Sequence, residues 1–307
     1  MKIVALIEKE GWMARDLRRA AALTGHEMQT ARWSDLRGRV GGDDAVRAGD
    51  VNLSAADAVL LRTIRIGTFE QVFFRLDVLH RLEASGVAVI NPPRSIEVSV
   101  DKYVALAHLR EAGLRTPDTV ACQKYRDALD AFDELGGDVV IKPLFGSEGF
   151  GIGRVSERVM AQRAFSQLER MGAIAYVQQF VPHGREDYRV FVLGDRVLAA
   201  IRRHGVDWRS NVALGGRPEP LEPSGALASI ALRSARACGT LVAGVDVVFD
   251  RAGRPFVLEV NAIPGWKALA PATGIDVARA VIEYVAQRVG ARDEGMTDPL
   301  LSADDRC

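Results

Sequence analysis

The sequence predicts an α/β protein in which a parallel sheet comes first and an antiparallel sheet follows. Over roughly the first ninety residues, short apolar segments alternate with segments of helical periodicity, the pattern of a parallel sheet covered by helices on both faces. Further along the chain, two apolar segments flank Gly194-Asp195, and a glycine-containing two-residue connection is typical of a β-hairpin. The change of sheet type along the chain indicates more than one packed unit.

The first unit is expected to end at Pro92-Pro93, because prolines interrupt both helices and strands. Its apolar segments fit buried strands and its amphipathic segments fit helices: strands at 2–7, 58–61 and 87–90, and helices at 13–23 and 69–83. The polar segment Asp35–Asp50 contains several glycines, so an irregular excursion is expected there.

The remainder of the chain divides into two further units and a tail. The middle unit is predicted to contain a helix at 101–112, a strand at 139–142, a glycine-rich loop at 146–151, a helix at 157–170 and a strand at 175–181. The third unit is predicted to contain hairpin strands at 188–193 and 196–202, a helix at 226–238, strands at 245–249 and 256–260, and a last helix at 276–289. We therefore expect domains at 1–93, 94–181 and 182–290, with a disordered polar tail at 291–307.

Charge and composition argue against several classes of function. The 307 residues include 40 Lys and Arg and 40 Asp and Glu, so no overall field favours nucleic acid or a membrane surface. The three cysteines show no metal-ligand spacing and are too few for a disulfide framework. No apolar run is long enough to span a membrane, and charge follows Lys2–Ile7 too soon for a signal peptide. We expect a cytoplasmic protein with no nucleic-acid or membrane partner.

The loop Gly146–Gly151 follows a strand that ends in Lys142-Pro143. Glycines let backbone N–H groups approach phosphate oxygens, and a nearby lysine adds positive charge. The loop matches neither the P-loop pattern nor the dinucleotide fingerprint, so an ordinary turn is the alternative. Lys102, in the first turn of its predicted helix, is also compatible with a solvated surface position.

Polar side chains interrupt two apolar strands near the end of the chain. Glu259 and Asn261 lie on one face of a strand because side chains alternate with a period of two, and Asp246 lies in the preceding strand. A buried carboxylate is costly unless it is paired or binds a cation. Oxygen ligands on one sheet face suit Mg²⁺, whereas pairing with an arginine, or an outward-facing strand end, is the alternative.

Basic residues form a third group, at Arg189, Arg202-Arg203-His204 and Arg209-Ser210-Asn211. Guanidinium groups bind carboxylates and phosphates through paired hydrogen bonds. Taken singly, Arg203 and His204 are better explained as part of a solvated hairpin edge. As a set that converges on an acidic sheet, the basic residues favour an anion-binding site.

These motifs, in this order, resemble the ATP-grasp superfamily and most closely its RimK-like α-L-glutamate ligase branch. The matching segments run through residues 91–290: Asn91-Pro92, Asp101-Lys102, Ile141-Lys142-Pro143, Gly146–Gly151, Val177–Val181, Asp187–Val192, Arg209-Ser210-Asn211, Gly215-Gly216, Gly244-Val245-Asp246, Leu258–Asn261 and Pro264-Gly265. The resemblance implies an ATP-grasp fold, with an N-terminal parallel α/β (pre-ATP-grasp) domain, a small central lid subdomain and a C-terminal antiparallel-sheet subdomain.

The resemblance also implies a role for the matching residues. The residues that would bind ATP are Lys102, Lys142, Gly146, Ser147, Gly149, Gly151, Gln178, Gln179, Phe180, Val181, Asp187, Arg209, Ser210 and Asn211. Asp246, Glu259 and Asn261 would bind Mg²⁺, with Mn²⁺ as an alternative. Arg209 and Asn211 would act at the γ-phosphate, and Arg189 and Arg202 would recognise a carboxylate. Gln179 departs from the family pattern, which often has an acidic residue in this strand, and the departure bears on adenine contacts.

The implied reaction joins a carboxylate to an amine through an acyl-phosphate, at the expense of ATP. The resemblance favours glutamate as the amine, added to a small molecule, a coenzyme or a protein tail. The alternatives are an ATP-grasp ligase of the dipeptide or glutathione-synthase type, a phosphotransferase, and a non-catalytic ATP-binding module. The substrate pair stays open, as does assembly into a homo-oligomer.

Overall fold

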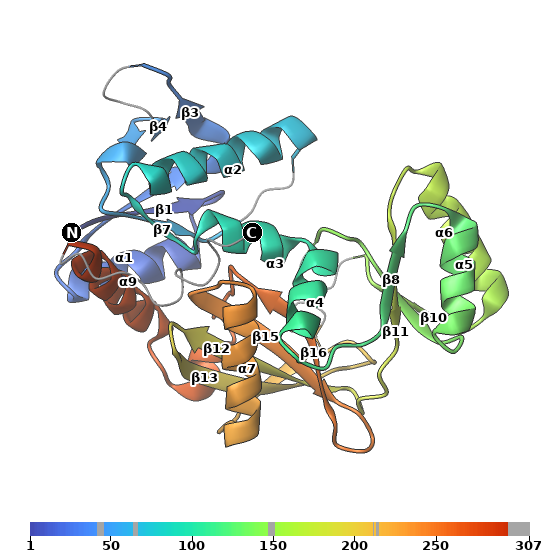
Figure 1. Cartoon of the computed structure of the whole chain (residues 1–307). Coiled ribbons are helices and arrows are strands. Elements are labelled where there is room, and N and C mark those ends of the chain that lie inside the picture. The colour runs from blue at the N-terminus through green and yellow to red at the C-terminus, as the bar shows by residue number, and fades with distance from the viewer. Residues whose placement is uncertain (42–45, 64–66, 147–150, 211, 213–214, 294–307) are drawn as a thin grey trace.

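The computed structural model of the chain describes residues 1–41, 46–63, 67–146, 151–210, 212 and 215–293 (Figure 1). The chain forms an N-terminal α/β lobe, a C-terminal lobe that lies against it, and a smaller lobe set to one side. Each of the three lobes is built around a sheet of its own.

The N-terminal sheet is parallel throughout, with the strand order β2-β1-β6-β7. Its strands are β1 (Lys2–Ile7), β2 (Glu27–Arg32), β6 (Ala58–Leu61) and β7 (Ala88–Ile90), and its covering helices include α1 (Trp12–Leu23), α2 (Phe69–Ala84) and α9 (Val277–Asp293). Ile3 and Ala5 of β1 pack in a core with α1 and α9, whereas Val4 and Leu6 pack in a second core with α2. Helices therefore cover both faces, as the alternating pattern predicted.

The prediction of an irregular excursion at 35–50 was wrong in part. The segment contains β3 (Leu36–Gly38) and β4 (Val46–Ala48), which form a small antiparallel sheet with β5 (Val51–Asn52). The short 3₁₀ turns η1 (Trp33–Asp35) and η2 (Leu53–Ala55) flank this sheet. Val46 and Ala48 are buried in the core beside α2, and this burial outweighs the polar composition that the sequence presents.

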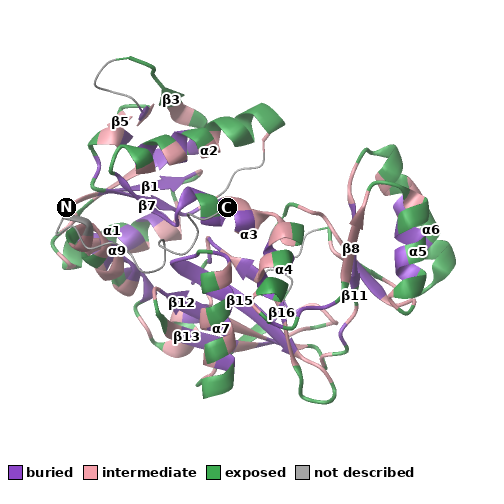
Figure 2. Cartoon of the chain, in the orientation of Figure 1, coloured by how far each residue is buried: buried purple, intermediate pink, exposed green. Residues whose placement is uncertain are grey.

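The smaller lobe holds an antiparallel sheet with the order β10-β9-β11-β8. Its elements are β8 (Thr119–Cys122), α5 (Tyr125–Glu134), β9 (Val139–Lys142), β10 (Gly153–Val155), α6 (Arg158–Arg170) and β11 (Ala175–Gln179). The helices α5 and α6 pack together on one face of the sheet, and their outer surfaces are exposed (Figure 2). These two helices leave the opposite face of the sheet uncovered.

The C-terminal sheet is antiparallel, with the order β14-β13-β12-β15-β16. Its elements are β12 (Glu186–Leu193), β13 (Arg196–His204), β14 (Arg217–Pro220), α7 (Gly225–Ala237), β15 (Val242–Phe249) and β16 (Pro255–Asn261), followed by the short α8 (Leu269–Thr273). The predicted hairpin around Gly194-Asp195 is confirmed, because β12 pairs with β13 across this turn.

Some helices of the predicted middle and last units pack against sheets that belong to other predicted units. Helices α3 (Pro93–Val100) and α4 (Lys102–Glu111) contribute Val98, Ala105 and Leu109 to the core beneath the C-terminal sheet, together with α7. The last helix, α9, returns to the N-terminal lobe and packs against α1. The division at residues 93, 181 and 290 stays a prediction.

The buried side chain of Asn91 links the N-terminal lobe to the C-terminal sheet. Its Oδ1 accepts hydrogen bonds from the backbone N–H groups of Leu241 and Val242, at 2.7 and 2.8 Å. Its Nδ2 donates to the carbonyl oxygens of Val242 and Ala262. An amide that satisfies backbone groups of two strands at once fixes where the first lobe meets the second.

Candidate functional site

A pocket lies where the smaller lobe meets the C-terminal sheet. Residues from β9 and β11 line it on one side, and residues from β12, β15 and β16 line it on the other. Its polar lining residues are Lys102, Lys142, Gln178, Gln179, His183, Asp187, Arg209, Ser210, Asp246 and Glu259. A concave site with apolar walls and a few converging charges is the usual form of a small-molecule site.

Charged side chains form a row across the strands of the C-terminal sheet. Strand register places Asp187 opposite Arg203, and it places Arg189 opposite Asp246, which in turn lies opposite Glu259. Cross-strand partners share a face, so these five side chains lie on the side of the sheet that bears the pocket, which we call the pocket face. The other side, covered by α4 and α7, is the helix face.

The members of the row neutralise one another. Arg189 donates two hydrogen bonds to Asp246, from Nε to Oδ1 at 2.7 Å and from Nη2 to Oδ2 at 2.6 Å. Arg203 bridges two carboxylates: Nε and Nη2 donate to Asp187 at 2.6 and 2.5 Å, and Nη2 also donates to Asp246 at 2.8 Å. Only 2% of the Arg203 side chain and 5% of the Asp246 side chain are exposed, so the pairs are screened from water.

Two of the carboxylates that line the pocket, those of Asp246 and Glu259, have pKa values shifted in opposite directions. Burial opposes the charge of Asp246, but Arg189 and Arg203 hold the pKa of Asp246 well below its ordinary value. Burial raises the pKa of Glu259, and the neighbouring Asp246 raises it further, although Arg189, Lys142 and Lys102 oppose the rise. Glu259 is therefore the carboxylate that gains most from an added cation.

Two lysines bring positive charge to the same pocket. Lys142 ends β9, and burial lowers the pKa of its ammonium group to about 8. Burial also lowers the pKa of Lys102, whose Nζ donates to the carbonyl oxygen of Gly146 at 2.8 Å. An anionic ligand between the lysines would offset the cost of burying both charges.

The loop after β13 brings Trp208, Arg209 and Ser210 to the pocket wall. Gly205 makes this path possible, because a Cβ atom at this position would lie 2.2 Å from the carbonyl oxygen of Arg209. Arg209 donates to Asp207 at 2.7 Å. The third residue of the predicted Arg-Ser-Asn motif, Asn211, lies outside the described residues.

Aromatic side chains close one end of the pocket. Phe180 packs edge-on to Trp208 with ring centroids 6.0 Å apart, and it contacts the ring of His183 at 5.8 Å. The guanidinium of Arg154 lies over the Phe180 ring at 3.6 Å. These rings give the pocket a flat apolar wall beside Gln178, whose Nε2 donates to Thr119 Oγ1 at 3.0 Å.

The structure brings most of the predicted site residues together, and it separates others. Most of the residues expected to bind ATP line the pocket: Lys102, Lys142, Gly146, Gln178, Gln179, Phe180, Val181, Asp187, Arg209 and Ser210. Gly151 and Asn261 are described but are not part of the pocket lining. Ser147 and Gly149, predicted to contact phosphates, lie outside the described residues.

Arg202 and Arg203 exchange the positions expected from the sequence. Arg202 points to the helix face, where Nη2 donates to Glu219 at 2.9 Å, so it is not positioned to recognise a carboxylate in the pocket. Arg203, expected at a solvated edge, is buried in the row. His204 does lie at the partly exposed edge, between Glu186 and Glu219. A β-bulge between Phe191 and Val192 shifts the register by one residue and thereby swaps the two arginines.

Arg189, which was also expected to recognise a substrate carboxylate, is paired with carboxylates of the protein itself. Its guanidinium pairs with Asp246 of the protein, and its Nη2 lies 3.6 Å from Glu259.

The sequence analysis did not identify His183 and Trp208 as pocket residues, because they carry no motif of their own. Only their position after β11 and before Arg209 could have indicated them.

The residues predicted to hold Mg²⁺ have oxygen lone pairs that are available to bind a cation. Asp246 Oδ1 accepts a single hydrogen bond, from Arg189, and Glu259 faces the pocket. Asn261 Oδ1 accepts one hydrogen bond, from the N–H of Ile263 at 2.9 Å, which leaves a second lone pair. Among the described residues, no group of three or more His, Cys, Asp or Glu side chains is arranged to hold a metal. A cation would fit here only by sharing its ligands with phosphate oxygens or water, as Mg²⁺ commonly does.

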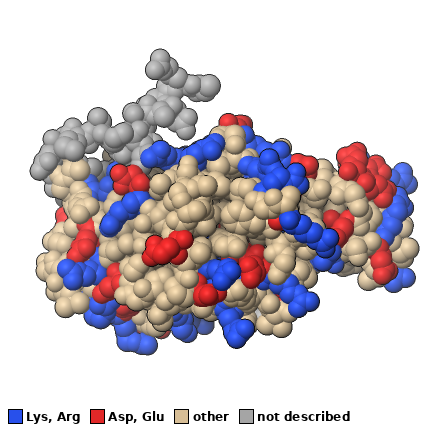
Figure 3. All heavy atoms as spheres, turned by 90° about the horizontal axis from the view of Figure 1, so that it is seen from below, with Lys and Arg blue, Asp and Glu red and all other residues tan. Residues whose placement is uncertain are grey.

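The face of the molecule seen from below shows no large area of one charge sign (Figure 3). In the view from below, basic and acidic side chains are interspersed over the whole visible face (Figure 3). In the part of the chain that the structure describes, none of the helices has the length and apolar character needed to cross a bilayer.

Known proteins resemble the chain over nearly its whole length. Residues 99–285 match the model of the RimK-like ATP-grasp domain. The tetrahydromethanopterin:α-L-glutamate ligase of Methanosarcina acetivorans is 31% identical, over 92% of this chain and 97% of that protein. A probable α-L-glutamate ligase of Trichodesmium erythraeum is 35% identical, over 78% of this chain and 80% of that protein.

A solved structure shares the fold. The ATP-grasp ligase PsnB, determined with a minimal precursor, Mg and ADP, superposes with a TM-score of 0.72. It is 21% identical and covers 94% of this chain and 98% of that one. The predicted ATP-grasp fold is confirmed, and the structure contains a parallel sheet and antiparallel sheets. The chain therefore belongs to the RimK-like ATP-grasp family, and it is an ATP-dependent, ADP-forming ligase.

Proposed function

We propose that this protein joins the amino group of glutamate to a carboxylate, through an acyl-phosphate formed from ATP. Two relatives whose names include α-L-glutamate ligase support glutamate as the amine. The observation that carries the proposal is the juxtaposition of Lys102 and Lys142 with Asp246 and Glu259 in one pocket. Such a pocket matches a polyphosphate chain accompanied by a divalent cation.

The pocket suggests an orientation for ATP. The aromatic wall at Phe180, with Gln178, Gln179 and Val181, suits a planar base, and Asp187 suits the ribose hydroxyls. The two lysines then lie toward the phosphates, and Arg209 lies beside the terminal phosphate on the loop after β13. A role for Asn211 at the same phosphate stays a prediction.

Asp246, Glu259 and Asn261 would hold Mg²⁺, because their free oxygen atoms are the hard ligands that this ion prefers. Bound Mg²⁺ supplies neutralisation of the charge that develops on the transferring phosphoryl group. PsnB was determined with Mg and ADP, in agreement with this choice. Arg189 and Arg203 keep Asp246 ionised and oriented, so they are positioning residues for the ligand set.

The reaction proceeds in two displacements. A carboxylate oxygen of the acceptor attacks the γ-phosphorus, and ADP leaves. The amine nitrogen then attacks the acyl carbon, phosphate leaves, and the nitrogen loses a proton to give the amide. The chain positions the reactants and excludes water, which would otherwise hydrolyse the acyl-phosphate.

Phosphate release from ATP, measured across a panel of carboxylates with and without glutamate, tests the proposal. We expect one class of carboxylate to give release that depends on glutamate, with a product whose mass equals the sum of the two substrates less water. Glutamate-independent turnover with another amine, such as alanine, would replace glutamate and favour the dipeptide-ligase alternative. The acceptor, a cytoplasmic location, the use of Mn²⁺ and a homo-oligomeric state stay predictions.

A further inference from the structure

A buried arginine that pairs with no carboxylate of the described residues lies at the end of strand β6. Arg62 follows Leu61 directly, at the carboxyl edge of the N-terminal parallel sheet, and it is 5% exposed. Its Nη2 donates to the carbonyl oxygen of Pro264, and its guanidinium lies 4.3 Å from the ring centroid of Trp266. Its Nε is buried and has no hydrogen-bond partner among the residues that the structure describes. Burial lowers the pKa of this arginine to about 9.

This arrangement differs from that of Arg203, which is also buried, and of Arg189, which is partly buried. Arg189 and Arg203 are each matched by carboxylates of the chain. Within the part of the chain that the structure describes, no carboxylate pairs with Arg62. A buried charge is normally paired, because burial without a counter-ion is costly. An anion that is not part of the described chain would relieve this cost.

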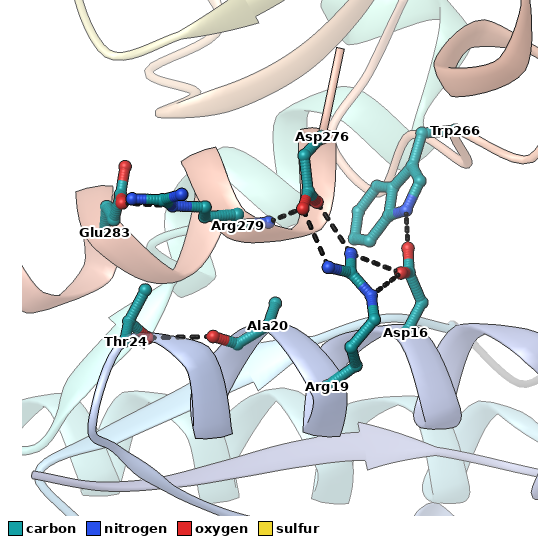
Figure 4. Close-up of polar contacts among 8 residues, drawn as sticks. All are labelled: Asp16, Arg19, Ala20, Thr24, Trp266, Asp276, Arg279 and Glu283. Carbon is teal, nitrogen blue, oxygen red and sulfur yellow. Dashed lines mark hydrogen bonds and ion pairs between the residues drawn. The ribbon is translucent and has the colours of Figure 1, made fainter. Parts of the chain in front are cut away.

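Trp266 fixes the position of the guanidinium. The indole is fully buried, and its Nε1 donates to Asp16 Oδ2 at 2.9 Å, while Asp16 also accepts from Arg19 (Figure 4). The ring makes edge contacts with Trp12 and Phe191, with centroids 6.2 and 6.4 Å apart. A ring held from three sides presents Arg62 in a preorganised position.

The start of helix α1 provides a second feature that favours an anion beside Trp266. Trp12 is the first residue of this twelve-residue helix, whose N-cap is Gly11. No side chain caps the helix, and its first turn carries no acidic residue. Free N–H groups at a helix N-terminus attract anions. Trp266 thus contacts the ring of Trp12, the first residue of α1, and also the guanidinium of Arg62.

Arg62 is connected to the pocket face through a series of contacts. Pro264, which accepts the hydrogen bond from Arg62, packs against Gly244, since a Cβ there would lie 3.1 Å from Pro264 Cβ. The same position lies 3.7 Å from Arg189 Nε, and Arg189 pairs with Asp246. Arg62 is therefore linked to Asp246 through Pro264, Gly244 and Arg189, from the side of the N-terminal lobe.

We infer that Arg62 and the N-terminus of α1 form a subsite for a carboxylate group of one of the two substrates. The inference rests on the proposed function, because it assigns the part of a substrate that is remote from the reacting carbon. A substrate bound in this way carries a second carboxylate, as glutamate does. The same chemistry is available from an acceptor with two carboxylates, and the experiment separates the two sources.

The experiment compares Arg62→Met and Arg62→Lys with the wild-type protein. Calorimetry measures the binding of L-glutamate in the presence of Mg²⁺ and a non-hydrolysable ATP analogue, and steady-state assays give KM for the acceptor. We expect Arg62→Met to weaken one of these by about 10- to 100-fold, the loss of a charge-assisted contact. Affinity for the ATP analogue should stay within about twofold, and Arg62→Lys should retain part of the binding.

Unfolding measurements separate a binding role from a structural one. Removing an uncompensated buried charge should leave the thermal midpoint of the ligand-free Arg62→Met protein unchanged or raised. Arg115→Gln is the matched control, because it removes another guanidinium stacked on a ring, that of Phe256 at 5.6 Å, away from this subsite. It should change neither substrate constant.

The outcomes identify the ligand or overturn the inference. A change for L-glutamate but not for the acceptor assigns the subsite to the amine substrate, and the reverse assigns it to the acceptor. If the wild-type protein lacks glutamate-dependent turnover, the proposed function fails, and binding of glutarate and citrate then tests the subsite alone. The inference is overturned if Arg62→Met binds every carboxylate as the wild-type protein does, or if the wild-type protein binds none. If Arg62→Met does not fold, the same comparisons are made with Arg62→Lys.

Discussion

The two faces of the C-terminal sheet carry similar charged residues in different environments. On the pocket face, Asp187, Arg203 and Asp246 form ion pairs whose side chains are 2 to 7% exposed. On the helix face, Arg202 and His204 pair with Glu186 and Glu219 near the sheet edge, where the side chains are 32 to 49% exposed. The difference shows that burial, and not the type of ion pair, separates the row at the pocket from the cluster at the sheet edge.

Burial also explains why the pocket face is suited to chemistry. Charges fixed in a region from which water is excluded interact strongly and need no reorganisation when a phosphoryl group moves. Exposed pairs on the helix face are screened by water and salt. Four variants test this distinction.

Arg203→Leu should have the largest effect. It leaves Asp187 and Asp246 buried without their shared partner, so we expect the free energy of unfolding to fall by about 3–5 kcal/mol. Urea denaturation followed by circular dichroism measures the change. A loss no greater than that of Arg202→Leu would show that the two faces do not differ.

Glu259→Gln should reduce turnover by about 100- to 1,000-fold, because it removes a charge from the proposed magnesium ligands. Nucleotide binding should persist, since the aromatic wall and both lysines remain. Initial rates of phosphate release, with calorimetry of ATP analogue binding, check both parts. Glu219→Gln on the helix face is the matched control, and wild-type turnover in Glu259→Gln would remove it from the ligand set.

The affinity for ATP should depend on pH through Lys142. Its pKa of about 8 means that the free protein carries the charged ammonium below this pH and loses it above. Phosphate binding favours the charged form, so binding takes up a proton above about pH 8, and affinity should fall by up to about tenfold per pH unit there. Titration calorimetry from pH 6.5 to about 9.5 measures the slope. Lys142→Arg should remove this dependence because an arginine stays charged, and an unchanged slope would assign it to another group.

Arg202→Ala should have the smallest effect. Its partners are exposed acidic residues, and such pairs contribute little to stability. We expect KM for both substrates and the unfolding midpoint to match the wild type within error. A rise in KM for either substrate would restore the carboxylate-binding role that the sequence suggested for it.

Local pattern was enough to predict much of the fold. The strands at 2–7, 58–61 and 139–142 lie where the apolar segments predicted them, because a buried strand needs a short run of apolar side chains. The elements that were missed, β8 and α5 among them, are short or polar, and packing against neighbours stabilises them. The ordered motifs identified the family and most of the pocket lining, since each motif keeps its residues close together along the chain.

The sequence by itself determined the fold class, the order of the longer apolar elements and most of the residues that converge on a nucleotide-type pocket. It did not determine which arginine faces that pocket. Counting outward from the Gly194-Asp195 turn pairs Asp187 with Arg202, whereas the bulge at Phe191 and Val192 pairs it with Arg203. Only the tertiary structure decided this, because a one-residue shift of register reverses the face of every side chain beyond it. It likewise decided that Arg62 is buried with no carboxylate partner among the described residues, because burial depends on segments far away in the chain.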